Sequence, residues 1–415
     1  MEIQRGYKTE LKPNNKQRTL LLKSAGTARW AYNWGLAQKQ QARDAGVKSP
    51  TAIDLHRQLN AIKSAQVPWM YEVSKCAAQE ALRNLDKAFD NFFRKCKLKK
   101  QGKFKGKVGY PKPKSKKKGV GSFRLTGSII VLSDSIQLPR IGTLRLKERD
   151  YIPVDAKVLC ATVSEEAGKW FVSVQVEEEI VNELPSLPEV VSGNDLGITA
   201  LATCSGGEVF ENPKALRKNL KKLRRLGKRV SRKVKGSKNR KKAVRRLAKL
   251  HQRIGNIRKD AIHQCTSYLS KTKTVNVLED LNVSGMLKNR RLARAIADVG
   301  LFEFRRQMVY KSEWYASTLV IANRWFPSTQ RCCKCHQTQP MPLGKDVFAC
   351  ESCGNTMPRD LNASENLKQY YTDSLSGIYA CGEPSADVAD GLRETQLVEA
   401  GNEQKSRSPR FSQVS

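Results

Sequence analysis

Three acidic side chains occupy positions from which carboxylates could act together. Asp195 lies inside the apolar, glycine-containing run Val190–Ile198, and Glu279 follows the apolar run Val275–Leu278. Asp360 directly precedes a stretch whose apolar residues have helical spacing. A lone carboxylate at a strand or helix end is usually a cap or an ion-pair partner. Two strands and one helix can, however, bring three such groups to one point of a fold.

Three converging carboxylates predict a site for two Mg²⁺ ions, because this cation prefers hard oxygen ligands. Two such ions, about 3.5–4 Å apart, stabilise both the attacking and the leaving oxygen of a phosphodiester. The order Asp, Glu, Asp along the chain is that of RuvC-type nucleases, whereas transposases with a related core usually run Asp, Asp, Glu. That comparison is an analogy at the level of the fold.

The cysteines predict a second metal site. Two C-x2-C pairs are separated by 14 residues and contain Cys332, Cys335, Cys350 and Cys353. Four thiolates at this spacing can close a tetrahedral Zn²⁺ site with no open position, which is typical of structural zinc. Cys333 allows another pairing, but its C-x-C spacing suits such a site less well. We do not expect the neighbouring His336 to be a ligand.

The charge of the chain limits its partners. Its 415 residues carry 76 Lys+Arg against 39 Asp+Glu, a formal charge of +37, which favours an acidic polymer such as nucleic acid. There is no apolar run long enough to span a bilayer and no apolar signal-peptide core at the start, so we expect no membrane partner and no secretion. The odd number of cysteines, 11, favours a reducing compartment. The expected location is cytoplasmic and nucleoid-associated.

The basic residues are concentrated in two runs. Thirteen Lys/Arg lie between Arg94 and Lys118, and 22 lie between Lys214 and Lys259, with no acid in either run. A solvated face or a disordered segment is one reading of such runs. In the second run, leucines and valines at near-helical spacing, interrupted at Gly236-Ser237, predict two basic helices with a narrow apolar seam. Such an arm, residues 214–260, can lie along phosphates.

The remaining pattern predicts several further elements. Residues 14–43 and 73–93 have helical spacing, the latter with Ser74 as N-cap, and residues 120–180 alternate as β-strands. Pro185 and Pro188 mark a boundary. From about residue 373 the chain is polar and acidic, and we expect a disordered tail over 373–415.

Five motifs, in this order, resemble those of the TnpB family. They are Gly193–Ile198, Leu278–Leu281, Lys288–Arg294, Phe326–Gln330 before the cysteines, and Arg359–Ser364. The family comprises RNA-guided nucleases of IS200/IS605 and IS607 insertion sequences and is regarded as the ancestor of Cas12. The resemblance covers roughly residues 1–372.

The resemblance implies an α/β multidomain fold. It implies a β-barrel wedge domain over 1–20 and 103–185, interrupted by a helical recognition lobe over 21–102. An RNase H-like (RuvC) nuclease domain would follow over 186–328 and 357–372, with a zinc ribbon over 329–356 inserted before the last acid.

The resemblance also implies the site residues and partners. Asp195, Glu279 and Asp360 would be catalytic and bind two Mg²⁺ ions, and the four cysteines would bind one structural Zn²⁺. The partners would be a guide RNA from the end of the element and a DNA target, double-stranded and single-stranded; a monomer is compatible with this. Lys75 and Gln79 match helix positions that help read a transposon-adjacent DNA motif. The arginines expected to contact nucleic acid are Arg290, Arg291 and Arg294.

Three departures from the family pattern bear on activity. Asn194 replaces an apolar residue, His336 replaces the glycine of the first knuckle, and Met357-Pro358 replaces a polar pair. The alternative function is therefore a cleavage-poor RNA-guided DNA-binding regulator of transposition or transcription. A strand-joining transposase is disfavoured by the order of the acids, and a purely structural RNA-binding protein does not explain three acids at strand and helix ends.

Overall fold

The computed structural model describes residues 2–179, 190–342 and 344–375, which fall into two compact units. The N-terminal unit comprises residues 2–179, and the C-terminal unit comprises the described residues from 190 onward. Pro185 and Pro188, predicted to mark a boundary, lie outside the described residues, as does the predicted tail beyond residue 375. Residues 373–375 belong to the last helix, so the helix extends further than the sequence suggested.

The helices of the N-terminal unit confirm both predicted helical segments. Helix α1 (Asn15–Asp44) opens with a capping box, and α3 (Lys75–Lys100) is capped by the Ser74 side chain. Between them lie α2 (Ala52–Gln66) and the 3₁₀ helix η1 (Pro68–Glu72). Helix α1 meets α3 at Gly35, where a Cβ atom would lie 2.7 Å from a methyl of Leu82, so a larger residue would require these side chains to shift.

The sheet of the N-terminal unit has seven strands in the order β2-β6-β7-β1-β5-β4-β3. Trp170 and the valines that alternate with polar residues along β7 are buried, which confirms the predicted strand. One hydrophobic core runs through the helices and the sheet. The division into a barrel and a recognition lobe remains a prediction. The strands are β1 (Glu2–Lys12), β2 (Ser122–Leu125), β3 (Ile130–Val131), β4 (Ser135–Leu138), β5 (Gly142–Leu146), β6 (Lys157–Glu166) and β7 (Lys169–Glu179), with a short 3₁₀ helix η2 (Lys116–Lys118) before β2.

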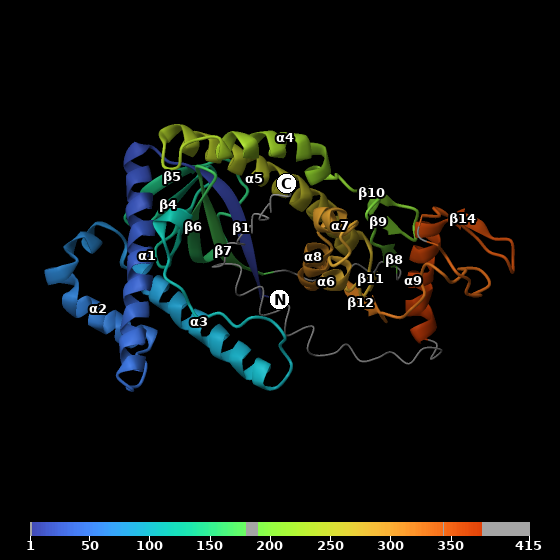
Figure 1. Ribbon diagram of the computed structural model, residues 1–415, viewed down its shortest axis with the longest axis horizontal. Helices are drawn as coiled ribbons and strands as arrows, with labels where there is room; N and C mark the ends of the chain where they lie inside the picture. Colours follow the sequence, from blue (N-terminus) through green and yellow to red (C-terminus); the bar gives the residue numbers. More distant parts are fainter. Residues whose placement is uncertain (1, 180–189, 343, 376–415) are drawn as a thin grey trace. The chain divides into compact units, whose positions relative to one another are not determined.

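The C-terminal unit is built on a five-stranded sheet in the order β10-β9-β8-β11-β12 (Figure 1). The strands are β8 (Val191–Asp195), β9 (Ala200–Cys204), β10 (Val209–Glu211), β11 (Val275–Glu279) and β12 (Thr318–Ala322). Strand β11 is parallel to both β8 and β12, whereas β9 is antiparallel to β8 and β10. Parallel strands place their carboxyl ends at one edge of the sheet, where β8 and β11 end in acids.

Helices cover both faces of this sheet. Val277 of β11 packs with Leu367 of α9 (Arg359–Leu375) on one face. Leu278 points to the other face, where it packs with residues of α5 (Lys238–Thr272) and α8 (Leu301–Trp314). Because side chains alternate along a strand, this burial pattern fixes which face each acid points to.

The basic run 214–259 forms the predicted helix pair. Helix α4 (Ala215–Ser231) and α5 pack through an apolar seam that includes Leu223, Leu250 and Ile254. Gly236, at φ +87°, and the Ser237 N-cap form the turn. The short helices α6 (Val283–Met286) and α7 (Ala293–Val299) and the hairpin of β13 (Val347–Ala349) and β14 (Thr356–Pro358) complete the unit. Within the described ranges, no helix is long and apolar enough to cross a membrane.

Candidate metal centres

Asp195 and Glu279 are the last residues of two neighbouring parallel strands. The register pairs Leu278 with Asn194, so the next residues along, Glu279 and Asp195, lie side by side. Adjacent strands are about 4.8 Å apart. Glu279 points to the same face as Val277, the face that α9 covers. Gly193 lies against α9, and Asp195 points to the same face because it follows Gly193 by two residues along the strand.

Helix α9 brings the third acid to this edge. It lies so close to β8 that a Cβ atom on Gly193 would be 2.0 Å from the Ser364 carbonyl oxygen and 2.4 Å from the Lys368 nitrogen. Glycine is therefore required at 193 by backbone contact. Ser364 lies one turn after Asp360, which is in the first turn of α9. The close contact at Gly193 thus carries Asp360 toward Asp195.

Asp195 is in an electrostatically unfavourable place for a charged group. It is 8% exposed, and no hydrogen-bond donor or ion pair meets its carboxylate among the described residues. Burial raises the pKa of Asp195 well above its ordinary value, and the negative charges of Glu279 and Asp360 raise it further. Arg359, which pairs with Asp360 at 2.9 Å, lowers it in part. The three acids therefore form one cluster that is short of positive charge.

Glu279 is positioned by Ser328, which lies in the motif Phe326–Gln330 but to which the sequence analysis assigned no role. The hydroxyl of Ser328 donates a hydrogen bond to its carboxylate, although burial still leaves the pKa of Glu279 raised. Both residues line a cleft of about 210 Å³. The neighbouring Asp280 pairs with Arg305 and Arg324, and these outweigh the effect of its burial and lower its pKa. Asp280 is thus neutralised, in contrast to Asp195.

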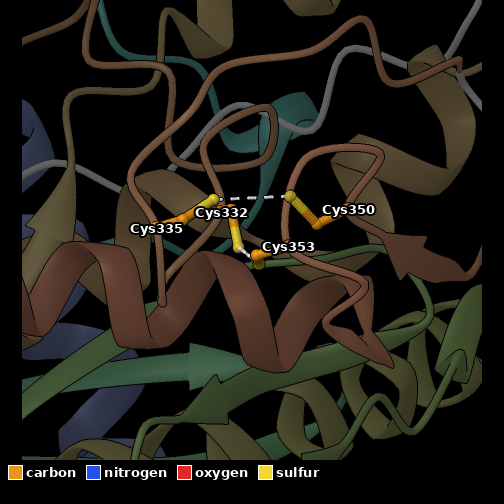
Figure 2. A group of neighbouring side chains, drawn as sticks. All are labelled: Cys332, Cys335, Cys350 and Cys353. Carbon is orange, nitrogen blue, oxygen red and sulfur yellow. Dashed lines mark hydrogen bonds between the residues drawn. The ribbon is translucent and has the colours of Figure 1, made fainter.

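The four predicted cysteines meet in one cluster (Figure 2). Their sulfur atoms all lie within 4.8 Å of one another, with Cys332–Cys353 at 3.7 Å and Cys335–Cys350 at 3.5 Å. A tetrahedron of sulfurs around zinc, with Zn–S near ~2.3 Å, has edges of about 3.8 Å. The cluster therefore fits Zn²⁺. Among the described residues, the carboxylate oxygens of Asp195, Glu279 and Asp360 do not all lie within 4.8 Å of one another as the four sulfurs do.

The two cysteine pairs have the same local geometry. The backbone N–H of His336 donates to the Cys332 carbonyl at 3.0 Å, and that of Gly354 donates to the Cys350 carbonyl at the same distance. His336 and Gly354 adopt left-handed φ values of +63° and +70°. A glycine meets this demand without strain, which explains the family preference that His336 departs from. The His336 ring instead contacts Arg331 at 2.7 Å and lies outside the sulfur cluster.

Cys333 does not join the cluster. Its sulfur contacts Met357 at 3.4 Å, and its backbone N–H donates to the Asn362 side chain at 3.0 Å. Met357, one of the departures from the family pattern, thus packs inside the ribbon, and its side chain makes no hydrogen bond or ion pair with the three acids.

The ribbon is fixed to α9 by three amide side chains at positions i, i+4 and i+7. Asn362 and Asn366 donate to the Arg331 carbonyl at 2.7 and 2.6 Å, and Gln369 donates to the Cys333 carbonyl at 2.7 Å. Asn366 also donates to the Ser328 carbonyl at 2.8 Å. One helix therefore carries Asp360 and holds both the ribbon and the residue that orients Glu279. Only their helical spacing in the sequence could have indicated this row.

Asn194 points to the face of the sheet opposite Asp195. It is fully buried, its amide donates to the Ser192 carbonyl at 3.0 Å, and it accepts from the Ser192 hydroxyl at 3.1 Å. Asn276 of the neighbouring strand is 3.5 Å away. The polar group is thus satisfied within the sheet and does not contact the acids.

The residues expected to contact nucleic acid lie on the surface of their units. At the start of α3, Lys75 is exposed and Gln79 is half-buried. Burial lowers the pKa of the nearby His56, and the positive charges of Lys63, Lys75 and Arg83 lower it further. This surface is therefore electropositive. The other three residues are exposed and have no ion pair among the described residues: Arg290, Arg291 and Arg294. These positions are compatible with nucleic-acid contact but do not test it.

Three family models match the chain. Residues 171–290 match a model described as a probable transposase (OrfB_IS605), and residues 302–367 match the Cas12f1-like TNB domain. Residues 1–48 match a model described as a helix-turn-helix domain. In the structure these residues comprise strand β1 and the continuous helix α1, without a turn between two helices before Asp44.

Curated relatives match over nearly their whole length. A "Putative RNA-guided DNA endonuclease" of Streptomyces pristinaespiralis is 34% identical over 94% of this chain and 92% of its own. "Putative RNA-guided DNA endonuclease InsQ" of Escherichia coli K12 is 32% identical over 92% and 95%. A solved CasPhi-2 (Cas12j) complex with crRNA overlaps with a TM-score of 0.43 at 11% identity, covering 88% of this chain and 98% of that one. On the matches to the transposase model and to these relatives, the chain belongs to the TnpB family.

Proposed function

We propose that the protein is an RNA-guided DNA endonuclease of a transposable element, cutting DNA next to a transposon-adjacent motif with two Mg²⁺ ions. The names of the relatives support the reaction class. The order of the five-stranded sheet supports an RNase H-like, RuvC-type nuclease domain. A wedge barrel and a recognition lobe in the N-terminal unit, with RNA and DNA as partners, belong to the same proposal.

The buried carboxylate of Asp195, which meets no hydrogen-bond donor in the part of the chain that the structure describes, is the observation that carries this proposal. It is surrounded by low-dielectric packing and two further acids, so that its charged form is disfavoured. Buried charges in proteins are normally paired or bind metals. Three carboxylates are hard oxygen donors that suit Mg²⁺. The donor set therefore fits divalent cations at this edge of the sheet.

The residues of the chain have separate roles in this proposal. Asp195 and Glu279 hold the cations and Asp360 completes the site. When bound, the cations stabilise the charge on the attacking and leaving oxygens of the phosphodiester. Ser328 orients Glu279 through its hydroxyl, and Arg359 partly neutralises Asp360. The basic surface retains the polyanionic strand.

The four-cysteine cluster is proposed to hold one structural Zn²⁺. Burial disfavours the thiolate of Cys332, but hydrogen bonds from the backbone N–H groups of Cys335 and Lys334 outweigh it and lower the pKa of Cys332 to about 6. A hydrogen bond from the Gln337 backbone N–H lowers the pKa of Cys335, but burial and the neighbouring sulfurs outweigh it and raise that pKa to about 12, so the metal-free cluster keeps part of its protons. A thiolate is the form that binds zinc. The ion would fix the ribbon, which in turn supports Ser328 and α9.

Nothing in the geometry of the two departures nearest the acids favours the cleavage-poor regulator. Asn194 faces away from Asp195, and Met357 packs against Cys333. The three acids are all present. We therefore retain nuclease activity as the proposed function.

The test is a cleavage assay with the protein purified together with its bound RNA. The complex is incubated with Mg²⁺ and a plasmid that carries the guide match beside a randomised motif library. Cutting that depends on Mg²⁺, on the guide match and on the adjacent motif is expected. A plasmid that stays uncut while RNA-dependent binding persists would establish the regulator instead.

The matched control is Asp195→Ala. It should abolish cutting and leave RNA-dependent DNA binding unchanged, because it removes a proposed metal ligand and no surface cation. Asp280→Ala is the comparison variant, because Asp280 is paired with two arginines and is not proposed as a ligand.

A further inference from the structure

A pocket of about 420 Å³ opens in the N-terminal unit between α1 and η1. Its walls include Trp30 and Trp69, whose rings meet edge to face at 5.8 Å, and Trp34 stacks against Trp30 at 6.1 Å. Trp69 is 40% exposed. The size is within the range of about 300–1,000 Å³ for small-ligand sites. The pocket therefore offers aromatic walls to a planar ligand.

Gly26 lines this pocket from the middle of α1. Glycine inside a helix destabilises it relative to alanine. At Gly35 of the same helix, close packing against Leu82 of α3 accounts for the glycine. At Gly26 a Cβ atom would meet only the flexible end of Arg29, at 3.9 Å. Packing of the protein does not explain Gly26, whereas a ligand that approaches the helix backbone would.

A basic segment is tied to the same part of α1. The Asn33 side chain, which lines the pocket, accepts from the Lys114 backbone N–H at 2.7 Å and donates to the Lys114 carbonyl at 2.9 Å. Arg29, also in the lining, donates to the Val120 carbonyl at 3.0 Å. The run that contains Lys114 has thirteen basic residues and no acid between Arg94 and Lys118. Aromatic walls beside a basic track are what single-stranded nucleic acid requires.

We propose that this pocket holds one unpaired nucleotide of a single-stranded RNA. The base stacks on the tryptophan walls and the basic segment neutralises the neighbouring phosphates. Glu72 lines the pocket and pairs through one carboxylate oxygen with Lys23 of the same lining, and its other oxygen offers an acceptor to a ribose 2′-hydroxyl, a donor that DNA lacks. The proposal rests on RNA being a partner, as in the proposed function, but not on the three acids.

The first test replaces Trp69 with alanine in the full-length protein. Fluorescence anisotropy measures the affinity for labelled A, C, G and U homopolymers and for their DNA counterparts at several salt concentrations. Trp69→Ala should weaken binding of at least one RNA by roughly five- to 150-fold, the contribution of one stacked base. The slope of log affinity against log salt should stay unchanged, because a neutral side chain releases no counterions. Trp69→Phe should restore most of the affinity.

The control for this test is Phe93→Ala, which removes another exposed aromatic side chain of the same unit. It should leave the RNA affinities within about twofold of the wild type. Equal losses of RNA affinity in both variants, or no loss for Trp69→Ala, would contradict the binding of a nucleotide in this pocket. An equal loss for the DNA homopolymers would overturn the assignment to RNA. Failure of the wild type to bind any RNA would instead contradict the proposed function.

A second test separates stability from binding at Gly26. Gly26→Ala should raise the unfolding temperature, because it removes a helix-interior glycine where no neighbour is displaced. Gly26→Leu should fill the pocket and weaken RNA binding about tenfold or more, while circular dichroism shows the folded protein. A folded Gly26→Leu variant that binds RNA like the wild type would contradict the proposal.

Discussion

At the scale of single residues, Asp280, which follows β11, and Asp195, which ends β8, show how environment separates function from structure. Asp280 has two arginine partners and a lowered pKa, which is the behaviour of an ordinary surface ion pair. Asp195 is buried beside two acids and has a raised pKa. Strongly perturbed groups of this kind cluster at functional sites.

The raised pKa makes Asp195 a source of instability in metal-free protein. The folded state holds the proton more tightly than the unfolded state, so stability falls as pH rises above about 3.9, the unfolded pKa, through the raised folded value. Asp195→Asn should therefore raise the unfolding temperature at neutral pH in EDTA-free, Mg²⁺-free buffer. Each unit of pKa shift removed is worth about 1.4 kcal/mol.

Added Mg²⁺ should stabilise the wild type at neutral pH and leave the Asp195→Asn variant unchanged. Differential scanning calorimetry at pH 5 and pH 8 measures both effects. A variant that is less stable than the metal-free wild type at pH 8 would show that Asp195 is not an uncompensated charge.

His336 provides a second residue-level prediction. Its left-handed backbone suits glycine, is tolerated by histidine and is poorly tolerated by a β-branched residue. His336→Gly should change ribbon stability by less than about 1 kcal/mol, since relief of strain offsets loss of the Arg331 contact. His336→Val should destabilise it by about 1–2 kcal/mol. The rate of zinc release to a chromogenic chelator measures this, and equal rates for the valine and glycine variants would contradict it.

At the scale of elements, helix α9 links the parts of the site. It contacts β8 at Gly193, carries Asp360 and holds the ribbon through its row of amides. A displacement of this helix would move the third acid, the ribbon and Ser328 together. The geometry of the site thus depends on one helix–strand contact.

Gly193→Ala tests that contact. The added methyl would overlap with backbone atoms of α9, which cannot move aside as a flexible side chain can. We expect a loss of stability of about 1–3 kcal/mol and a drop in cleavage rate of about 100-fold, the effect of a displacement near 1 Å. Urea unfolding and single-turnover cleavage measure the two effects.

Gly255→Ala in α5 is the matched control, because a Cβ atom there meets nothing within 4 Å. It should keep the stability or increase it slightly. A Gly193→Ala variant that behaves like this control would contradict the close approach of α9 to β8.

Local patterns predicted the elements and the ligand types, but not the contacts between them. The spacing of Cys332 to Cys353 identified the four-cysteine cluster because all its cysteines lie within one short segment. Asp195 and Glu279 were identified as strand-end acids, yet their adjacency depends on the pairing of strand residues that are 84 positions apart, such as Asn194 and Leu278. The requirement for Gly193 and the role of Ser328 arise from long-range packing, which leaves no periodic signal in the sequence.

At the scale of the whole molecule, the charge of +37 sets the salt dependence expected for the proposed binding of nucleic acid. The arm of α4 and α5 buries only a narrow apolar seam, so most of its cations face solvent. Phosphate contacts release counterions, and affinity should therefore fall steeply with salt. A flat response would contradict a phosphate-binding arm.

Lys241→Ala and Lys242→Ala test the arm, since both side chains are exposed on α5. Each substitution should reduce the slope of log affinity against log salt by about one if that lysine contacts a phosphate. Filter binding of the purified protein to RNA between about 50 and 200 mM salt measures the slope. Unchanged slopes in both variants would show that this part of α5 does not contact phosphates.

The most direct measurement is the anomalous diffraction of Mn²⁺ in crystals of the protein with its RNA and an uncut DNA target. Two anomalous peaks about 3.5–4 Å apart, coordinated by Asp195, Glu279 and Asp360, are expected, together with their loss in Asp195→Ala. Manganese peaks that lie away from these three acids, in crystals of a protein that cuts its target in solution, would contradict the account.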